Sequence, residues 1–361
     1  MTGVRGPMSG IRKFDVVIAG ASFAGLAAAQ RVLPSRTPDS EQRTPSVLLL
    51  DKDPIGAGVT SACAAPLATV RAMGAEVSIR QLHHEIVIHT PRTRTVWPLP
   101  EAFCTFDYRQ FCELAFAGTG AAFIQASVLG RTGSVVQTSA GDITGRFLVD
   151  ATGWRAALTG GGQASAHRWL AFGVETEVQA EVGPGLRFYF VPEIPDGYAW
   201  VFPVQEKARI GVLSYRGHSS LGPALQAFLD RLGLRPAEYH GGFLASGLRA
   251  PVIDGVFVAG DAAGQCLPVT GEGIRTAVQA GFRCGELLQD VLAERESERS
   301  ARRVYSTFVE QSRREYRVLL AMNRLVGSLP IPLRGVLAGL VGQPRLLQAF
   351  MRNYLGILAY N

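Results

Sequence analysis

Several features that would place the chain in a special class are missing from its sequence. No apolar run reaches about 18 residues, the length at which a segment becomes a candidate for crossing a membrane. The first twelve residues lack the apolar core of a secretory signal. No internal repeat and no low-complexity window interrupts the 361 residues, 47% of which are hydrophobic. We therefore expect a globular, cytoplasmic protein with one large or two medium cores.

Cysteine and histidine are few and scattered. The five cysteines form no C-x-x-C pair and no Cys/His ligand spacing: Cys63, Cys104, Cys112, Cys266 and Cys284. This odd, dispersed set predicts reduced thiols and no structural metal. The adjacent His83 and His84 are predicted to be a solvated feature of a strand rather than a ligand pair.

Lysine is nearly absent. It occurs only at Lys13, Lys52 and Lys207, so almost all of the 36 basic residues are arginine, which favours bidentate contacts with anions. The net charge is +6, but the basic residues form no dense tract with interleaved aromatics, which argues against a nucleic-acid partner. A phosphate-bearing substrate or an anionic membrane surface fits better. Arg295–Arg317 is predicted to be a mixed-charge helix with a solvated face.

The sequence does contain a glycine turn between a strand and a helix near its start. Val16–Ala19 has the pattern of a buried parallel strand, and Gly25–Val32 has that of an alanine-rich helix. Gly20 would form the tight turn and Gly25 the close helix-strand contact, while Ser22 replaces the middle glycine of G-x-G-x-x-G. Such a turn directs backbone N–H groups and a helix N-terminus toward a pyrophosphate. We assign these turn residues to cofactor binding: Gly20, Ser22, Phe23, Ala24 and Gly25.

Two further segments extend this nucleotide signature. Asp51 follows the predicted strand Ser46–Leu50, where its carboxylate would accept both hydroxyls of an adenosine ribose. Its distance from the turn exceeds the usual spacing of about 20 residues because Pro34–Thr44 is predicted to be a surface loop. Far downstream, a Gly-Asp turn at 260–264 is followed by Pro268–Ile274. Turns in this order indicate one nucleotide cofactor held from both ends, and FAD fits best.

The remaining pattern predicts interleaved domains. Alternating strands are expected over Val77–Trp97, a helix over Arg109–Phe116, and further strands over Phe123–Val128 and Phe147–Asp150. Trp169–Leu213 is strand-rich and aromatic. We predict a discontinuous FAD-binding domain (14–76, 105–160 and 250–293), a substrate domain (77–104 and 161–249) and a helical C-terminal region (294–361).

Near the C-terminal end of the FAD-binding domain, Val256–Ala259 restores the parallel-strand pattern, and a helix is predicted from Gly273 to about Leu292. Breaks are expected in the later helical region at Pro330, Pro332 and Pro344.

A family resemblance depends on a signature in the substrate domain. Tyr198-x-Trp200-x-Phe202-Pro203, followed after seven residues by Gly211, resembles the YxWxFP signature of the geranylgeranyl reductase family of FAD-dependent oxidoreductases. Together with the segments above and Asp150-Ala-Thr-Gly, the resemblance covers about residues 14 to 290. It implies an α/β fold with a Rossmann-like FAD-binding domain of the glutathione reductase type, similar to that of p-hydroxybenzoate hydroxylase. An inserted antiparallel-sheet substrate domain and a helical C-terminus would complete this fold.

The resemblance also implies roles for single residues. Asp261 would contact the ribityl-phosphate part of FAD, the backbone of 271–274 would lie against the isoalloxazine, and Arg109 would begin a helix near the cofactor. Beyond the turn, the implied cofactor-binding residues are Asp51, Lys52, Arg109, Val128, Gly153, Asp261, Gly271, Gly273 and Ile274. The implied lining of the substrate cavity is Tyr198, Trp200 and Phe202.

The chain departs from the family pattern in three places, one of which is a C-terminal region that is short for the family. Cys63-Ala64-Ala65 stands where Cys-Gly-Gly is common, so the cysteine matches but its flexible neighbours do not. Leu213 occupies the position at which a glycine would complete Gly-x-Gly after the aromatic signature.

The activity that the resemblance implies is reduction of C=C bonds in a prenyl or related lipid. Reduced FAD delivers a hydride to one carbon while a proton reaches the other, and the protein must contribute a proton source and a dry, apolar tunnel. Cys63 is the first candidate near the flavin face and Tyr198 the second, with Trp200 also in the candidate catalytic set. The competing interpretations are a buried small hydrophobe for Cys63 and core packing for the aromatic residues.

Other functions fit the same scaffold. The main alternative is an FAD-dependent monooxygenase that acts on an aromatic or polyketide-like small molecule. A flavin-binding scaffold, electron carrier or non-redox isomerase is a further one. No second glycine fingerprint for a nicotinamide domain is visible, so an external donor such as NAD(P)H or ferredoxin is expected. Val318–Leu340 is interpreted either as an interfacial helix pair in peripheral contact with a membrane or as a lid on the cavity.

Overall fold

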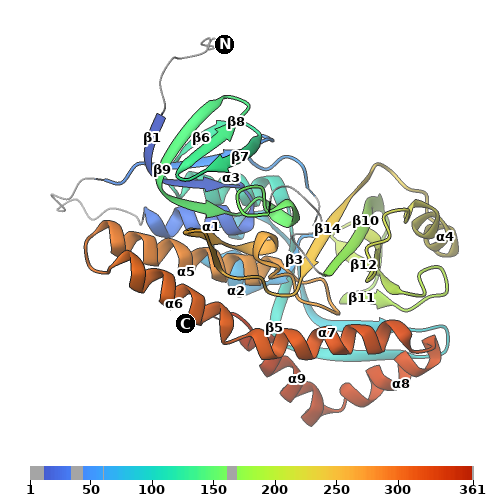
Figure 1. Cartoon of the computed structure of the whole chain (residues 1–361). Coiled ribbons are helices and arrows are strands. Elements are labelled where there is room, and N and C mark those ends of the chain that lie inside the picture. The colour runs from blue at the N-terminus through green and yellow to red at the C-terminus, as the bar shows by residue number, and fades with distance from the viewer. Residues whose placement is uncertain (1–11, 34–43, 60, 161–168, 360–361) are drawn as a thin grey trace.

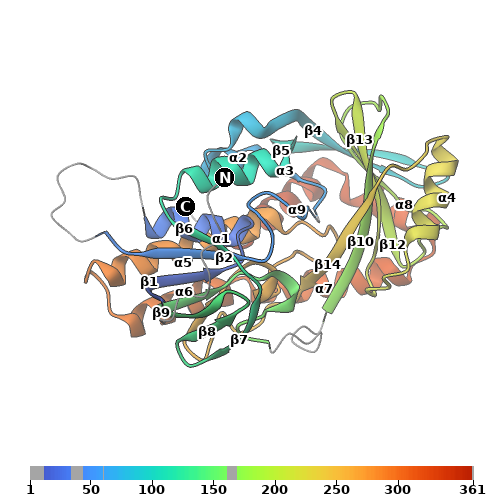
Figure 2. The same ribbon diagram turned by 90° about the horizontal axis from the view of Figure 1, so that it is seen from above.

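The computed structural model describes residues 12–33, 44–59, 61–160 and 169–359. Two β-sheets stand side by side, and helices from the last part of the chain run beneath both (Figures 1 and 2). The predicted α/β class with a helical C-terminus is confirmed. The predicted loop Pro34–Thr44 lies outside the described residues except for Thr44.

The first sheet is mostly parallel. Its main path has the order β15-β16-β9-β1-β2-β6, in which β15 alone is antiparallel to its neighbour, and β7 and β8 extend β9 as antiparallel strands. Its strands are β1 (Arg12–Ala19), β2 (Val47–Asp51), β6 (Ala122–Gln125), β7 (Val128–Thr132), β8 (Val135–Thr138), β9 (Gly141–Asp150), β15 (Val252–Ile253) and β16 (Val256–Val258). The parallel order brings the carboxyl ends of β1, β2, β9 and β16 to one edge, where α/β sheets bind ligands.

Two helices pack closely against each other on one face of this sheet. They are α1 (Phe23–Val32) and α5 (Ile274–Leu292). A Cβ added at Gly281 would lie 2.3 Å from the carbonyl oxygen of Ala24, and one added at Gly285 would lie 2.3 Å from that of Ala28. These glycines therefore allow direct backbone contact between the helices. Both predicted helices are confirmed, as is the one over 109–116, which is α3 (Tyr108–Ala117).

The second sheet has the order β14-β10-β13-β12-β11-β4-β5-β3, and its neighbours are antiparallel except β11 and β4. Its strands are β3 (Ala64–Pro66), β4 (Ile79–His89), β5 (Arg94–Phe106), β10 (Trp169–Gln179), β11 (Leu186–Tyr189), β12 (Gly197–Val204), β13 (Lys207–Ser214) and β14 (Tyr239–Ser246). Alternation along β12 separates two cores. Ala199 and Val201 pack under α4 (Gly222–Leu232), whereas Trp200 and Phe202 lie on the opposite face.

The structure corrects the prediction of a single helix over Arg295–Arg317. Two helices occupy this stretch, α6 (Glu298–Glu310) and the beginning of α7 (Arg313–Ser328). Their inner side buries Tyr305 and Tyr316 completely or nearly so. Apolar residues at helical spacing among the charges therefore form a packing face, and only the opposite side is solvated.

Prolines begin the last two helices. Pro330 and Pro344 lie at the predicted breaks, but Pro332 does not break the chain, because it is the second residue of α8 (Ile331–Val341). Pro344 is the first residue of α9 (Pro344–Gly356). Proline is tolerated in a first turn because those N–H groups have no acceptor within the helix. Within the described ranges, no helix is long and apolar enough to cross a membrane.

The structure also corrects the prediction that His83 is solvated, because this side chain is buried. Its Nε2 lies 3.2 Å from Thr105 Oγ1, and burial lowers its pKa to about 4. A shift in the β4–β5 register between His83 and Glu85 accompanies this inward turn, and the adjacent His84 is exposed. All five cysteines are buried and free of disulfide bonds, as predicted.

Candidate active site

A cavity of about 970 Å³ is lined by residues of both sheets and of the C-terminal helices. One part is formed by the turns that follow β1, β2, β9 and β16, and the other by the aromatic face of the second sheet. The predicted site residues that line it are Gly20, Ser22, Phe23, Ala24, Asp51, Lys52, Cys63, Val128, Gly153, Tyr198, Trp200, Phe202, Asp261, Gly271, Gly273 and Ile274. Two predicted residues, Gly25 and Arg109, are not among the lining residues.

The glycine turn after β1 has strict steric requirements. Gly20 has a φ of +102°, and a Cβ at this position would lie 2.0 Å from the carbonyl oxygen of Ala151. A Cβ at Gly25 would lie 1.8 Å from the carbonyl oxygen of Gly20. Gly25 therefore acts through close packing of α1 on the turn. Arg109 is exposed on α3, and its backbone packs against Gly56.

Ser22 stands where a glycine is usual, and its hydroxyl is engaged. Tyr108 donates a hydrogen bond to Ser22 Oγ at 3.0 Å. Ser22 is also the N-cap residue of α1, yet its side chain accepts no hydrogen bond from the first turn. The N-terminal amides of α1 thus lack a side-chain cap next to the cavity, an arrangement that suits an anionic group such as a pyrophosphate.

Two carboxylates stand at separate positions along the cavity. Asp51 accepts hydrogen bonds from the backbone N–H of Ala21 at 2.8 Å and of Asp53 at 3.1 Å, so it joins β2 to the glycine turn. Asp261 accepts one from the backbone N–H of Ala245 at 3.2 Å, and burial raises its pKa to about 6. A carboxylate oxygen can accept more than one hydrogen bond, so both groups suit the hydroxyls of a nucleotide cofactor.

Tyrosine hydroxyls hold the loop that precedes α5. Tyr198 donates to the carbonyl oxygen of Thr270, and Tyr215 donates to that of Val269 at 2.8 Å. Tyr354 on α9 lies 2.8 Å from Thr270 Oγ1. Burial raises the pKa of all three phenols, so they remain neutral. The second sheet and α9 therefore fix the position of this loop, which includes Gly271.

The aromatic signature forms one wall of the cavity. Trp200 lies across Gly211, because a Cβ added at Gly211 would be only 2.1 Å from its Cζ2. Phe188 stands edge-on to Tyr198 and Phe202, with ring centroids 5.4 and 5.3 Å apart. The signature residues thus pack as a core cluster and line the cavity at the same time.

Cys63 lies at the junction of the sheets with a left-handed backbone (φ +49°). Its thiol donates to the carbonyl oxygen of Ser61 at 3.2 Å, and burial raises its pKa to about 12 although Arg209 opposes the shift. The Arg209 guanidinium donates to the carbonyl oxygens of Ala62 and Phe106 at 3.1 and 2.9 Å. The thiol is therefore held neutral in an arginine-supported loop.

Sequence reasoning missed Glu175 and His240, which also line the cavity. Glu175 is 3% exposed and accepts a hydrogen bond from Trp200 Nε1 at 2.6 Å. His240 Nε2 lies 3.1 Å from the other oxygen of Glu175. Glu175, Thr176 and Glu177 form a polar run in β10, and two glutamates two residues apart in a strand indicate one solvent-facing side. The sequence carried no signal of this burial.

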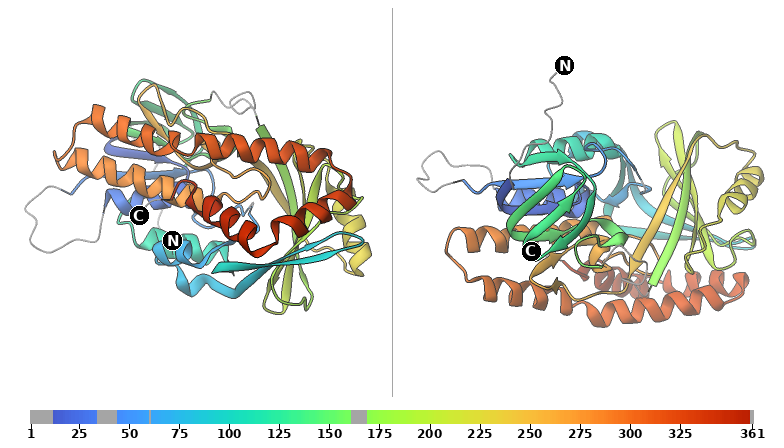
Figure 3. Two further views of the ribbon diagram at one scale, coloured as in Figure 1. Left: turned by 90° about the horizontal axis from the view of Figure 1, so that it is seen from below. Right: turned by 45° about the horizontal axis from the view of Figure 1, so that its top comes forward.

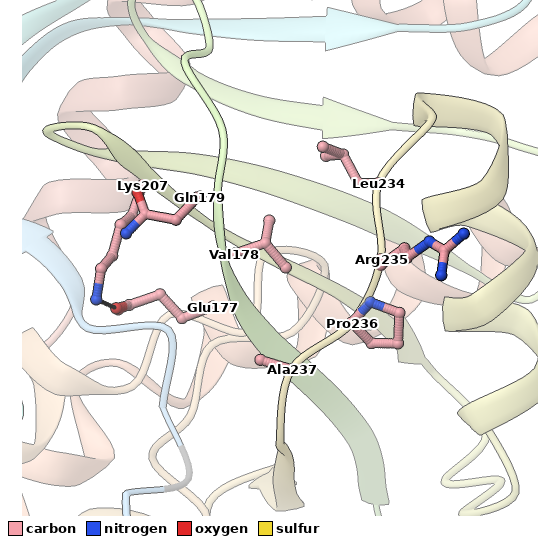
Figure 4. A pocket seen from close by; sticks show the side chains of 8 residues that line it. All are labelled: Glu177, Val178, Gln179, Lys207, Leu234, Arg235, Pro236 and Ala237. Atoms are coloured by element: carbon pink, nitrogen blue, oxygen red, sulfur yellow. Dashed lines mark hydrogen bonds and ion pairs between the residues drawn. The ribbon is translucent and has the colours of Figure 1, made fainter.

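A second, smaller pocket of about 380 Å³ shares no lining residue with the cavity (Figure 4). Lys207 and Glu177 form an ion pair of 2.9 Å at its edge, and Arg235 and Pro236 lie across from them. One end of β10, Lys207 at the start of β13 and the segment after α4 contribute to it. We therefore regard the larger cavity as the candidate active site.

Solved structures identify the fold as that of FAD-dependent enzymes. A geranylgeranyl bacteriochlorophyll reductase-like protein from Thermoplasma acidophilum superposes with a TM-score of 0.81 at 18% identity, over 97% of this chain and 98% of the other. A probable FAD-dependent monooxygenase from Pseudomonas aeruginosa superposes with a TM-score of 0.62 at 15% identity, over 94% and 100%. The predicted flavoenzyme fold, of the glutathione reductase and p-hydroxybenzoate hydroxylase-like type, is thus confirmed.

No family model matches the chain, but its sequence is similar to those of curated reductases. The digeranylgeranylglycerophospholipid reductase of Methanocaldococcus jannaschii is 38% identical over 112 residues, and the chain spans only 29% of its length. Digeranylgeranylglycerophospholipid reductase 1 of Methanothermobacter thermautotrophicus is 26% identical over 324 residues, or 79% of each chain. These similarities confirm the predicted resemblance to the geranylgeranyl reductase family.

Proposed function

We propose that this protein is an FAD-dependent oxidoreductase that reduces C=C bonds of a prenyl or related lipid. The observation that carries the proposal is a single cavity that joins nucleotide-type turns to an apolar, aromatic chamber. The names of the curated relatives support a geranylgeranyl-type chain as the substrate.

In this proposal the first sheet, with α1, α3 and α5, is the core of the FAD-binding domain. The uncapped N-terminus of α1 would hold the pyrophosphate, Asp51 the adenosine ribose, and Asp261 the ribityl hydroxyls. The loop around Gly271 would lie beside the flavin ring. When bound, FAD supplies the hydride.

The second sheet would form the substrate domain. Tyr198, Trp200 and Phe202 exclude water from the chamber, and Tyr198 also fixes the loop that carries Thr270. Cys63 contributes a neutral, apolar surface, because its pKa of about 12 keeps the thiol protonated. Electrons would come from an external donor, either NAD(P)H or ferredoxin.

The outer side of α7–α9 is a candidate for peripheral contact with an anionic lipid surface. Among the residues that the structure describes, six of the ten exposed large hydrophobic side chains lie in this segment: Val318, Leu325, Leu333, Val336, Leu340 and Leu346. The three helices lie along one side of the molecule (Figure 3, left). Their inner residues, including Val326, Leu337 and Met351, line the cavity, so a prenyl chain would have a short path from a bilayer to the chamber.

Charge supports this partner. Residues 311–361 hold seven arginines and one acidic residue, Glu315. The rest of the chain is balanced, with 29 basic and 29 acidic residues, so the net charge of +6 resides in this segment. Arg314, Arg317, Arg345 and Arg352 are exposed there. Exposed apolar side chains among arginines are typical of interfacial helices.

Vesicle flotation tests the membrane contact. Wild-type protein should float with phosphatidylglycerol vesicles but not with phosphatidylcholine vesicles, and Val336→Ser with Leu340→Ser should abolish flotation. The matched control is Val77→Ser with Leu129→Ser, which removes two exposed apolar side chains outside the C-terminal helices. Equal flotation of the two double variants would refute the contact.

The alternative function is that of an FAD-dependent monooxygenase on an aromatic or polyketide-like molecule, and the fold likeness to the Pseudomonas aeruginosa protein favours it. Mass spectrometry separates the two. Reduced protein incubated without oxygen should add about two mass units per double bond to a polyprenyl substrate. A gain of about sixteen units in an aromatic candidate, seen only in air, would establish the monooxygenase instead.

A further inference from the structure

One row of residues crosses four strands of the second sheet. His240 on β14 pairs with Glu175 on β10, Glu175 pairs with Gly211 on β13, and Gly211 pairs with Trp200 on β12. Because Gly211 has no side chain, the indole lies across it, and Nε1 reaches Glu175 Oε2 at 2.6 Å. His240 Nε2 is 3.1 Å from Glu175 Oε1. The tryptophan and glycine of the family signature thus hold a carboxylate that contacts a histidine.

The donors in this row determine which atom exchanges a proton. An indole N–H can only donate, so Glu175 Oε2 is an acceptor. The positive charge that neighbours Glu175 is that of Arg209 on β13. Glu177 and Cys63 are the other titratable groups that act on Arg209. With Glu175 as the carboxylate, His240 Nε2 carries a hydrogen directed at Oε1, and Nδ1 is the nitrogen that gains and loses a proton.

His240 is the more accessible member of the pair, and a group that regains a proton from solvent must be accessible. The Glu175 side chain is 4% exposed, whereas that of His240 is 28% exposed, and both line the cavity. The two residues predicted to lie near the flavin already donate their hydrogens to backbone carbonyl oxygens. Tyr198 donates its hydroxyl to Thr270, and the buried thiol of Cys63 donates to Ser61.

We propose that His240 donates the proton in the reduction, and that Glu175, held by Trp200, is its positioning residue. The inference depends on the function proposed above. The C=C π bond breaks and two C–H bonds form: one carbon receives a hydride from the reduced flavin, and the other receives the proton of His240 Nδ1. FAD is left oxidised, and the neutral imidazole keeps its Nε2–H on Glu175 and regains a proton from solvent.

His240→Gln tests the donor, because the amide can still contact Glu175 but carries no transferable proton. The measurement is the anaerobic rate at which a polyprenyl substrate reoxidises the reduced flavin, as a function of pH. We expect the rate to fall by about 10²–10⁴-fold and its pH dependence in the histidine range to disappear. His84→Gln, on an exposed histidine, should match wild type. If the pH profile of His240→Gln is the same as that of the wild type, whatever the size of the rate, the proposal is overturned.

A second readout does not depend on the substrate. The tautomer of the neutral His240 ring, read from its nitrogen chemical shifts by NMR, should be the Nε2–H form in the wild type, because a carboxylate at Glu175 can only accept there. In Glu175→Gln the single amide oxygen accepts from Trp200, so the amide NH2 faces His240 Nε2 and the ring should change to the Nδ1–H form. The same tautomer in both proteins would overturn the pair. If wild-type flavin is not reoxidised by any prenyl lipid, the proposed function fails, and the tautomer still decides whether Glu175 controls His240.

Discussion

Gly211→Ala should be among the most damaging small substitutions in the second sheet. The added Cβ would lie 2.1 Å from Trp200 Cζ2 and 2.5 Å from Cε2 and Cη2, whereas ordinary carbon contacts are about 3.5–4.0 Å. The indole must therefore move by more than about 1 Å. Overpacking of this kind costs about 1–3 kcal/mol. The displaced Nε1 leaves a buried oxygen of Glu175 without its donor, which costs about 1–3 kcal/mol more.

Urea denaturation measures the effect. We expect Gly211→Ala to lower the free energy of unfolding by about 2–6 kcal/mol and to change the tryptophan fluorescence of the folded state. Gly222→Ala is the matched control, because a Cβ at the start of α4 meets no atom within 4 Å, and its change should stay within about 1 kcal/mol. Equal unfolding curves for the two variants would refute the contribution assigned to the Trp200–Gly211 contact.

Three other substitutions test buried charge. Burial lowers the pKa of His83 to about 4, so between pH 6.5 and 4 the unfolded chain binds a proton that the folded chain does not bind. The free energy of unfolding should therefore fall by about 3 kcal/mol as the pH drops from 6.5 to 4. His83→Gln should remove this part of the pH dependence in denaturation experiments. Burial raises the pKa of Asp261 to about 6, so its negative charge destabilises the FAD-free protein above pH 6 and not below about 4. Asp261→Asn should raise the free energy of unfolding by about 2–3 kcal/mol at pH 7 and should weaken FAD binding, measured by calorimetry. A variant that binds FAD normally would contradict the contact between Asp261 and the ribityl group. Arg275 forms a buried ion pair of 3.1 Å with Glu272, so Arg275→Met should lower the free energy of unfolding by about 3–5 kcal/mol. Arg71→Met, which breaks an exposed ion pair with Glu76, should lower it by less than about 1 kcal/mol. Similar losses in the two variants would show that burial does not determine the effect.

Features that local sterics determine could be predicted from the sequence. Gly20 and Gly25 were assigned to a turn, and the structure gives each a contact that excludes a side chain. The helices predicted over Gly25–Val32 and from Gly273 followed from their apolar periodicity, and they are α1 and α5. The single helix predicted over Arg295–Arg317 was wrong, because α6 ends at Glu310 and α7 begins at Arg313. The apolar residues among the charges form a packing face that only the tertiary structure reveals.

Features that depend on long-range register could not be predicted. Glu175 meets His240 across 65 residues and Trp200 across 25, and nothing near Glu175 in sequence distinguishes it from a solvated strand residue. Tyr354 contacts Thr270 across 84 residues. The signature itself was recognised, but its physical meaning depends on the strand pairing that places Trp200 beside Gly211.

Anaerobic reoxidation shows whether a bound flavin in this protein reduces an isolated double bond. Purified protein with FAD bound is reduced chemically, oxygen is excluded, and flavin absorbance is followed after a polyprenyl lipid is added. We expect the oxidised flavin spectrum to return, with one flavin reoxidised for each double bond reduced in the product. A flavin that stays reduced with every prenyl lipid, and reoxidises only when oxygen enters, would contradict the proposed function.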